Sequence, residues 1–260
     1  MWGIDPLYSL SGFAVGFIVG MTGVGGGSLM TPLLILLFNV HPATAVGTDL
    51  LFAAITKTVG TAVHGGVNRS VDWKIVLTLG LGSVAAAAIT LVVLAQAGGQ
   101  SPEVAHLVGV VLGGMLLVTA LSLVLRRQLL ALATGVRAPS ARTQTILTLL
   151  FGAVLGVIVS ISSVGAGAIG VTVLMVLYAR LPLSRIVATD IAHAVPLTLV
   201  AGLGHWMIGN VEWGLLISLL VGSVPGIALA SFFAPKIPER VVRGLLAGVL
   251  VLVGLKLLTA

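Results

Sequence analysis

The chain has 260 residues, of which 58% are apolar and only 8% are charged, and its mean hydropathy is +1.21. Soluble globular domains carry about 25% charged residues, so this composition excludes them and indicates a polytopic membrane protein. The chain has no cysteine, which excludes disulfides and thiolate metal sites. The net charge of +6 comes from residues in short loops between apolar segments, so nucleic acid is not an expected partner.

An internal repeat divides the chain into two halves. The segment "GFAVGFIVGMTGVGGG", which begins at Gly12, matches "GAVLGVIVSISSVGAG", which begins at Gly152. Further along, "AVGTDL" (45–50) matches "IVATDI" (186–191). An ordered series of matches at one spacing indicates duplication. We therefore expect one integral membrane domain that consists of two repeats, residues 1–130 and 131–260.

Each repeat contains one long apolar segment followed by three shorter ones. The shorter segments are close to the roughly 20 residues that a spanning helix needs. The first repeat has its long segment at 7–38 and the others at 43–64, 74–97 and 104–125. In the second repeat the long segment is 143–179 and the others are 185–208, 213–234 and 240–258.

Apart from Lys57 and Lys256, lysine and arginine lie in or beside some loops and are absent from 39–42, 98–103 and 209–212, which predicts the orientation of the helices. Basic loops face the cytoplasm, and this requires segment 143–179 to enter and leave the membrane on one side. If segment 7–38 does the same, the repeats have inverted topology, as in many secondary transporters. The expected fold is an all-α polytopic membrane protein with two inverted repeats, each a broken-helix hairpin plus three transmembrane helices. We expect a multi-pass protein of the bacterial inner membrane, with the N-terminus outside and loop 126–142 in the cytoplasm.

Glycine-rich sequences interrupt the two long segments and predict hairpin tips within the membrane. Irregular backbone at that depth must be buried in protein or line a wet cavity, and glycine permits the reversal. Each tip precedes a new helix, whose free N–H groups and positive dipole end can bind a small anion. The predicted substrate-binding residues are Gly23, Val24, Gly25, Gly26, Gly27, Ser28, Ser162, Ser163, Val164, Gly165, Ala166 and Gly167. The alternative is that these glycines only allow close helix packing.

Ionisable residues within the predicted helices are candidates for coupling or gating. They are costly in a membrane and by default mark function. The candidates, with the threonines beside them, are Thr48, Asp49, Lys57, Thr189, Asp190 and His193. Lys57 can attract an anion, whereas the carboxylates and His193 can carry a coupled proton. Alternatively, the two Thr-Asp pairs bind free backbone N–H groups of the hairpins.

The sequence resembles the TauE/SafE sulfite exporter family. The resemblance rests on "GVGGG", "AVGTDL" and "HGGVNRSVDW" and on their degenerate second copy, and it covers nearly the whole chain. It implies a small membrane permease for sulfur-containing anions such as sulfite, sulfoacetate or related organosulfonates.

The expected function is secondary transport of such an anion by alternating access around the two tips. The sequence contains no HExxH, GxSxG or P-loop motif, so we expect neither an enzyme nor a cofactor or metal. The expected partners are a small anion, a coupled proton and membrane lipid. An anion channel is an alternative, and a membrane-embedded enzyme that acts on lipid phosphates is a weaker one.

Overall fold

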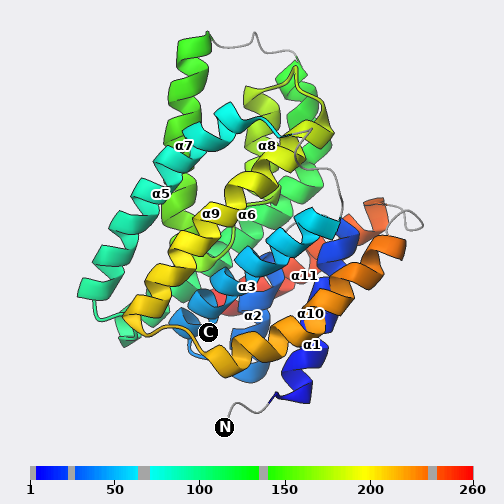
Figure 1. Ribbon diagram of the computed structural model, residues 1–260. Coiled ribbons are helices and arrows are strands. Elements are labelled where there is room, and N and C mark those ends of the chain that lie inside the picture. Colours follow the sequence, from blue (N-terminus) through cyan, green and yellow to red (C-terminus); the bar gives the residue numbers. More distant parts are fainter. Residues whose placement is uncertain (1–3, 23–26, 64–70, 135–139, 234–238, 260) are drawn as a thin grey trace.

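Ten helices make up the described part of this computed structural model, which comprises residues 4–22, 27–63, 71–134, 140–233 and 239–259. Figure 1 shows them in the order α1 (Pro6–Thr22), α2 (Gly27–Phe38), α3 (Pro42–Val63), α5 (Trp73–Gln96), α6 (Pro102–Thr134), α7 (Ala141–Ser162), α8 (Ala168–Leu177), α9 (Leu183–Ile208), α10 (Trp213–Phe233) and α11 (Glu239–Thr259). The described residues contain no strand, which confirms the all-α prediction.

Five helices are long and apolar enough to span a membrane, among the residues described. They are α5, α6 over Pro102–Leu125, α7, α9 and α10 over Trp213–Ala230. Helix α6 continues to Thr134, whereas the predicted segment ends at residue 125. The continuation, "RRQLLALAT", is rich in Arg, Gln, Leu and Ala, which all favour helix. The first part of the predicted loop 126–142 is therefore helical.

Both long apolar segments are interrupted where the glycines predicted a break. Helix α1 ends at Thr22 and α2 begins at Gly27, while α7 ends at Ser162 and α8 begins at Ala168. Each segment also folds back on itself. The Tyr8 and Phe38 rings, near the outer ends of α1 and α2, pack with centroids 4.8 Å apart. At the equivalent positions of α7 and α8, the Thr148 and Tyr178 hydroxyls share a 2.8 Å hydrogen bond.

The two arms of the second hairpin differ in length. Helix α7 has 22 residues, about 33 Å at 1.5 Å per residue, and α8 has 10, about 15 Å. The first hairpin has arms of 17 and 12 residues. Because α7 alone is long enough to cross a hydrocarbon core of about 30 Å, helix length does not fix the depth of the second tip.

The first helix of each hairpin packs against a helix of the other half of the chain. Helix α1 packs along α10 of the second half, and α7 packs along α5 of the first half. A Cβ added to Gly12 would collide with the backbone of Leu219, and a Cβ on the equivalent Gly152 would collide with that of Leu79. Helices α3 and α9 lie side by side and run in opposite directions (Figure 1). Two repeats related by a two-fold axis would give this pattern; their orientation across a membrane stays a prediction.

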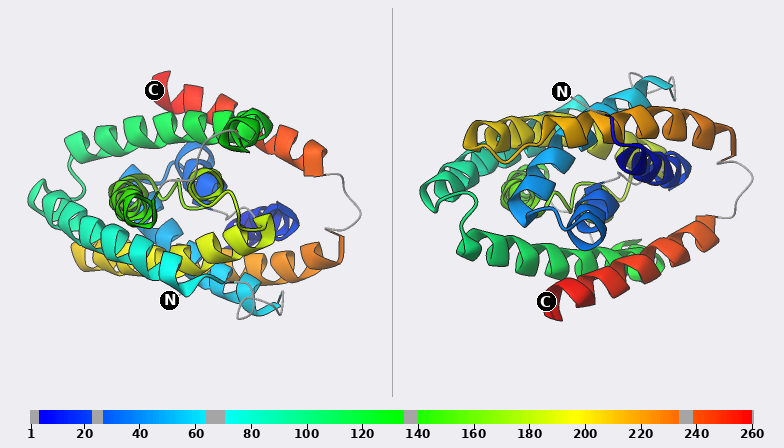
Figure 2. Two further views of the ribbon diagram at one scale, coloured as in Figure 1. Left: turned by 90° about the horizontal axis from the view of Figure 1, so that it is seen from above. Right: turned by 90° about the horizontal axis from the view of Figure 1, so that it is seen from below.

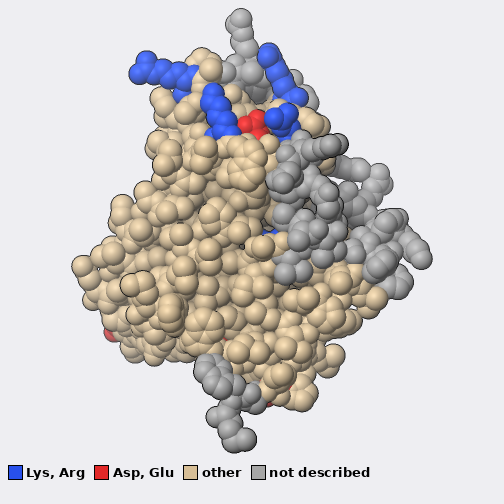
Figure 3. Space-filling model, in the orientation of Figure 1, with Lys and Arg blue, Asp and Glu red and all other residues tan. Residues whose placement is uncertain are grey.

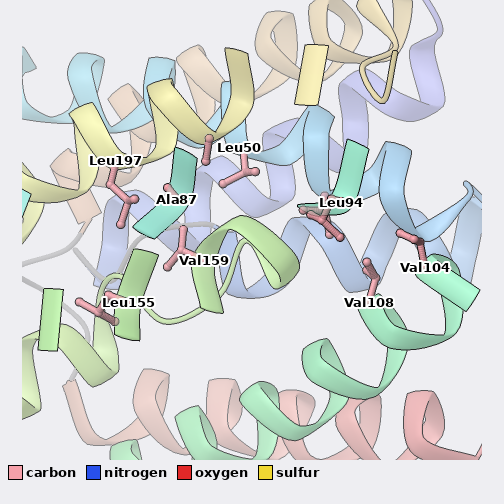
Figure 4. Close-up of a cluster of buried hydrophobic side chains, with 10 residues drawn as sticks. Leu50, Ala87, Leu94, Val104, Val108, Leu155, Val159 and Leu197 are labelled. Atoms are coloured by element: carbon pink, nitrogen blue, oxygen red, sulfur yellow. The ribbon is translucent and has the colours of Figure 1, made fainter. Parts of the chain in front are cut away.

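Long helices enclose the hairpins. Figure 2 shows α6 and α11 along one side of the molecule and α5, α9 and α10 along the other, with α1, α2, α7 and α8 between them. Buried aliphatic side chains fill the centre, among them Leu50, Ala87, Leu155 and Leu197 from four different helices (Figure 4). The hairpin tip of α7 and α8 is held against this core by Val159, one turn before α7 ends.

Exposed charge is distributed unequally between the two ends of the molecule. Lysine and arginine gather at one end, above an almost uncharged lateral surface (Figure 3). Exposed side chains at the starts of α5, α7 and α9 and after α8 form this basic end: Lys74, Arg142, Arg185 and Arg180. Arg185 pairs there with Asp72 at 3.4 Å. The loops at the other end carry Glu103 and Glu212.

Candidate functional site at the tip of the second hairpin

The connection between α7 and α8 is a tight backbone turn that needs glycine. Ser163, which follows α7, has φ = 58°, and Gly165 and Gly167 have φ of 125° and 135°. Side chains rarely adopt the last two values, so both glycines are required by geometry. Ser162, Ser163, Val164, Gly165 and Gly167 are buried and Ala166 is half-buried, so the protein covers the irregular backbone.

Free backbone donors lie at the start of α8. The turn closes with bonds from Gly170 N to Gly165 O and from Val171 N to Gly167 O. The N–H groups of Ala168 and Ile169 come before these bonds and therefore have no intrahelical acceptor. The positive end of the α8 dipole lies at the same place.

The two serines of this tip have different environments. The Ser162 hydroxyl donates to Ile158 O at 2.8 Å and accepts from Val164 N at 3.3 Å, so it stabilises the turn. The Ser163 hydroxyl is buried and has no hydrogen-bond partner. Of the two predicted serine donors, Ser163 is therefore the one available to a ligand.

The first tip is described only in part. Gly23, Val24, Gly25 and Gly26 lie outside the described residues. Gly27 and Ser28 form the first turn of α2, so a helix begins after this tip as well.

Asp49 connects helix α3 to both hairpins. Its side chain is fully buried, and its Oδ2 accepts a 2.5 Å hydrogen bond from Thr31 Oγ1 on α2. The Ser163 hydroxyl interacts with the same carboxylate without reaching hydrogen-bond geometry, and Asp49 Oδ1 has no partner. Thr31 interacts with Asp49 mainly through its side chain and also through its backbone N–H. The alternative in which the Thr-Asp pair binds the hairpin therefore stays a prediction.

Asp190, the equivalent of Asp49 in the second repeat, has a different environment. It is 1% exposed and lies against α8, where a Cβ on Gly170 would collide with Asp190 Oδ1. No donor within the described ranges forms a hydrogen bond with this carboxylate, and its Oδ1 is fully buried. The two predicted acids are therefore equivalent in sequence but not in their hydrogen bonds.

Lys57 lies between the two carboxylates and the tip. It is 9% exposed and interacts electrostatically with Asp190 and, less strongly, with Asp49. Its Nζ donates a long hydrogen bond of 3.5 Å to Ala166 O in the turn before α8. A buried cation is thus held beside the free N–H groups at the start of α8.

His193 extends this polar centre toward α5. Its Nε2 lies 2.8 Å from Ser83 Oγ, its Nδ1 has no partner, and it interacts with Lys57. Ser83 was not among the predicted site residues. The sequence does carry a signal for it, since Gly82-Ser83 recurs as Gly222-Ser223 at the spacing of the repeat.

The two predicted threonines bind the ends of other helices. Thr48 Oγ1 accepts a 3.2 Å hydrogen bond from Glu212 N, just before α10, and Thr189 Oγ1 accepts a 3.0 Å bond from Asp72 N, just before α5. Each threonine thereby connects its own half of the chain to the other. The structure does not bring Thr48 and Thr189 to the tip.

His205 is a second buried histidine outside the predicted site. Its Nε2 lies 2.8 Å from Ser160 O near the end of α7, and its Nδ1 lies 3.4 Å from Asn210 Nδ2. These contacts tie the end of α9 to the second hairpin. No motif predicted this pairing, because Ser160 is 45 residues from His205 in the chain and Asn210, although near in sequence, belongs to no motif.

The family profile described as "Sulfite exporter TauE/SafE" matches residues 8–257. The chain belongs to the TauE/SafE sulfite exporter family. It is 35% identical over 254 residues to the "Probable membrane transporter protein YjnA" of Bacillus subtilis, which covers 96% of this chain and 98% of that protein. It is also 28% identical over 235 residues to the "Probable membrane transporter protein YdhB" of the same organism, covering 89% of this chain and 91% of the relative.

A more distant relative is the "Probable membrane transporter protein MJ0441" of Methanocaldococcus jannaschii, 31% identical over 81 residues that are 29% of this chain and 30% of the relative. No solved structure matches the chain. Membership of the TauE/SafE family and the names of these relatives indicate a membrane transporter rather than an enzyme.

Proposed function

We propose that the chain is a secondary carrier for a small sulfur-containing anion, such as sulfite or an organosulfonate, and that it works by alternating access. The observation that carries this proposal is the buried centre at the second tip. There a lysine, an unpartnered serine hydroxyl and the first N–H groups of α8 lie together in a water-poor interior. Cation, hydroxyl and helix N-terminus are the groups that bind oxyanions.

The anion would occupy the space bounded by Lys57 Nζ, Ser163 Oγ and the start of α8. Each of these groups is a donor, and a tetrahedral or pyramidal oxyanion offers several acceptors to match them. The family name supports a sulfur oxyanion as the substrate class. The predicted tip of the first hairpin, including Gly23–Gly26, would complete the site from the other repeat.

The distribution of charge supports an orientation in the membrane. The basic end, with Lys74, Arg142, Arg180 and Arg185, would face the cytoplasm. Helix α1 begins at the opposite end, so the N-terminus would lie outside, in the inner membrane of a bacterium. Substrate would then reach the tips alternately from the two ends, as the two halves move relative to each other.

Transport can be tested with purified protein in liposomes. Sulfite, sulfate, thiosulfate, sulfoacetate and taurine are offered in turn, and uptake is measured with and without a pH gradient. We expect saturable uptake of at least one sulfur oxyanion. Uptake of none of the five would overturn the proposal. Single-channel currents without saturation would instead show the alternative, an anion channel.

A further inference from the structure

We infer that Asp190 is the group that binds the coupled proton, and that its carboxylate and the substrate anion compete for Lys57. This inference rests on the proposed function of the tip as an anion site. It starts from the unequal surroundings of two acids that occupy equivalent positions in the repeats. Among the residues that the structure describes, one of them has a partner for its charge besides Lys57, and the other does not.

Asp49 is the acid that stays in one form. Thr31 Oγ1 donates to its Oδ2, and the Thr31 backbone N–H interacts with the same carboxylate. Both donors stabilise an ionised acceptor. Asp49 also joins α3 to α2, so a change in its charge would disturb a contact between two helices.

Asp190 depends on Lys57 for any compensation of its charge. No donor in the described part of the chain bonds to it, and its other near neighbour is the α8 backbone at Gly170. A buried carboxylate without donors is costly unless a cation lies beside it. If an anion takes Lys57 as its own partner, Asp190 must accept a proton.

The surroundings of Asp190 contain few other titratable groups. From α3 it faces Lys57, which it shares with Asp49, and His193 follows it by one turn on α9. The polar neighbours that α5 and α7 contribute to this centre are Ser83 and Ser163, which do not titrate in this range, and α8 contributes the backbone at Gly170. His193 Nε2 is engaged by Ser83 Oγ. Within the described residues, neither His193 nor Ser83 donates a hydrogen bond to Asp190.

The exchange leaves the buried charge unchanged. Before substrate binds, the lysine cation is balanced by the Asp190 carboxylate. Afterwards it is balanced by a monovalent anion, while Asp190 has taken one proton from water and is neutral. One proton therefore moves with each monovalent anion, such as an organosulfonate or hydrogensulfite. Because Asp190 lies against the first turn of α8, protonation removes a negative charge that is in contact with this arm of the hairpin.

The first test observes the proton itself. Infrared difference spectra of purified protein between acidic and alkaline buffer are recorded for the wild type, Asp190→Asn and Asp49→Asn. We expect a buried carboxylic acid band in the wild type and in D49N that is absent from D190N. A band that survives in D190N, or is missing from the wild type, would overturn the inference without involving any substrate. If D190N does not fold, the spectrum of D49N still decides the question. A band retained in D49N supports Asp190, whereas loss of the band in D49N would assign the proton to Asp49.

The second test observes the coupling. Methanesulfonate, an organosulfonate, serves as the probe because it is a monovalent anion at every pH used, and its affinity is measured by thermal shift at several pH values. One linked proton makes affinity rise by up to about tenfold for each pH unit of acidification. We expect this slope in the wild type and D49N and a flat profile in D190N. Binding by the wild type without pH dependence would overturn the inference but leave the anion site intact, whereas failure of the whole anion panel would remove the site itself.

Discussion

Lys57 is the buried cation on which the proposed anion site depends. Replacing it with methionine keeps most of its volume and removes the charge beside Ala166 O. We expect K57M to lose anion binding by at least about 2 kcal/mol, the usual cost of removing a buried charge partner. Binding is measured as the thermal shift that the anion produces. K256M, which changes an exposed lysine in the last turn of α11, is the control and should bind normally. Equal binding by K57M and wild type would contradict the site.

Thr31 has a structural role that can be separated from transport. Thr31→Val preserves shape but removes the 2.5 Å hydrogen bond to Asp49. Because the carboxylate is fully buried, we expect a loss of about 1–3 kcal/mol in the free energy of unfolding. Unfolding is followed in detergent by circular dichroism. Thr58→Val, which removes a hydroxyl that donates to Ala54 O in the preceding turn of α3, is the control and should change stability less. Similar losses in the two variants would show that the hydrogen bond to Asp49 contributes no more to stability than a hydroxyl bonded within one helix.

At the scale of residues, the sequence identified which ionisable groups are buried but not what they contact. Asp49, Lys57, Asp190 and His193 were selected because each is costly inside a membrane, and all four are buried. Their partners could not be predicted, since Thr31, Ser83 and Gly170 come from three other helices. Thr48 and Thr189 were candidates for coupling or gating, and each bonds to the residue that precedes a distant helix.

Among the helices, α8 is the element whose position matters most to the proposed site. Its first turn touches Asp190 so closely at Gly170 that there is no room for a Cβ. Gly170→Ala should therefore displace the start of α8 and cost about 1–3 kcal/mol of stability, together with anion uptake. Gly80→Ala, on α5 with open space around it, is the matched control and should leave stability and uptake unchanged. Normal uptake by G170A would show that the position of α8 is not important.

The sequence predicted the broken elements well because the cause of each break is local. Gly165 and Gly167 have backbone angles that other residues avoid, and this preference can be read from residue type alone. The predicted end of α6 was wrong. Arg126 and Arg127 were taken as the start of a loop, although arginine favours helix. The unequal arms of the second hairpin also show that the depth of its tip depends on tertiary packing rather than on helix length.

For the whole molecule, the position of the basic end predicts a defined orientation in the membrane. The chain lacks cysteine, so single cysteines can report which side of a membrane each end occupies. Cysteines at exposed positions Lys74 and Arg180 should react with an impermeant thiol reagent from the cytoplasm, and cysteines at Glu103 and Glu212 from outside. Labelling of Glu103→Cys and Arg180→Cys from the same side would contradict the inverted arrangement.

The duplication was visible in the sequence, but the way in which the halves pack was not. The alignment paired Gly12 with Gly152, and the structure shows that each packs against a helix of the opposite half. Sequence comparison establishes equivalence between positions, whereas contact between them depends on how the helices assemble. The same distinction explains the two acids. Asp49 and Asp190 are equivalent in the repeat, but within the described ranges a hairpin hydroxyl donates to Asp49 and none donates to Asp190.

The central claim is that a buried tip near Ser163 binds the transported anion. The most direct measurement is the reaction of a single cysteine, Ser163→Cys, with a small anionic thiol reagent in liposomes, with and without sulfate or sulfoacetate. We expect the cysteine to react, uptake to stop after the reaction, and the transported anion to slow it, while Glu103→Cys reacts equally under all conditions. A transport-competent S163C protein that never reacts, or that reacts at the same rate with and without its substrate, would contradict the account.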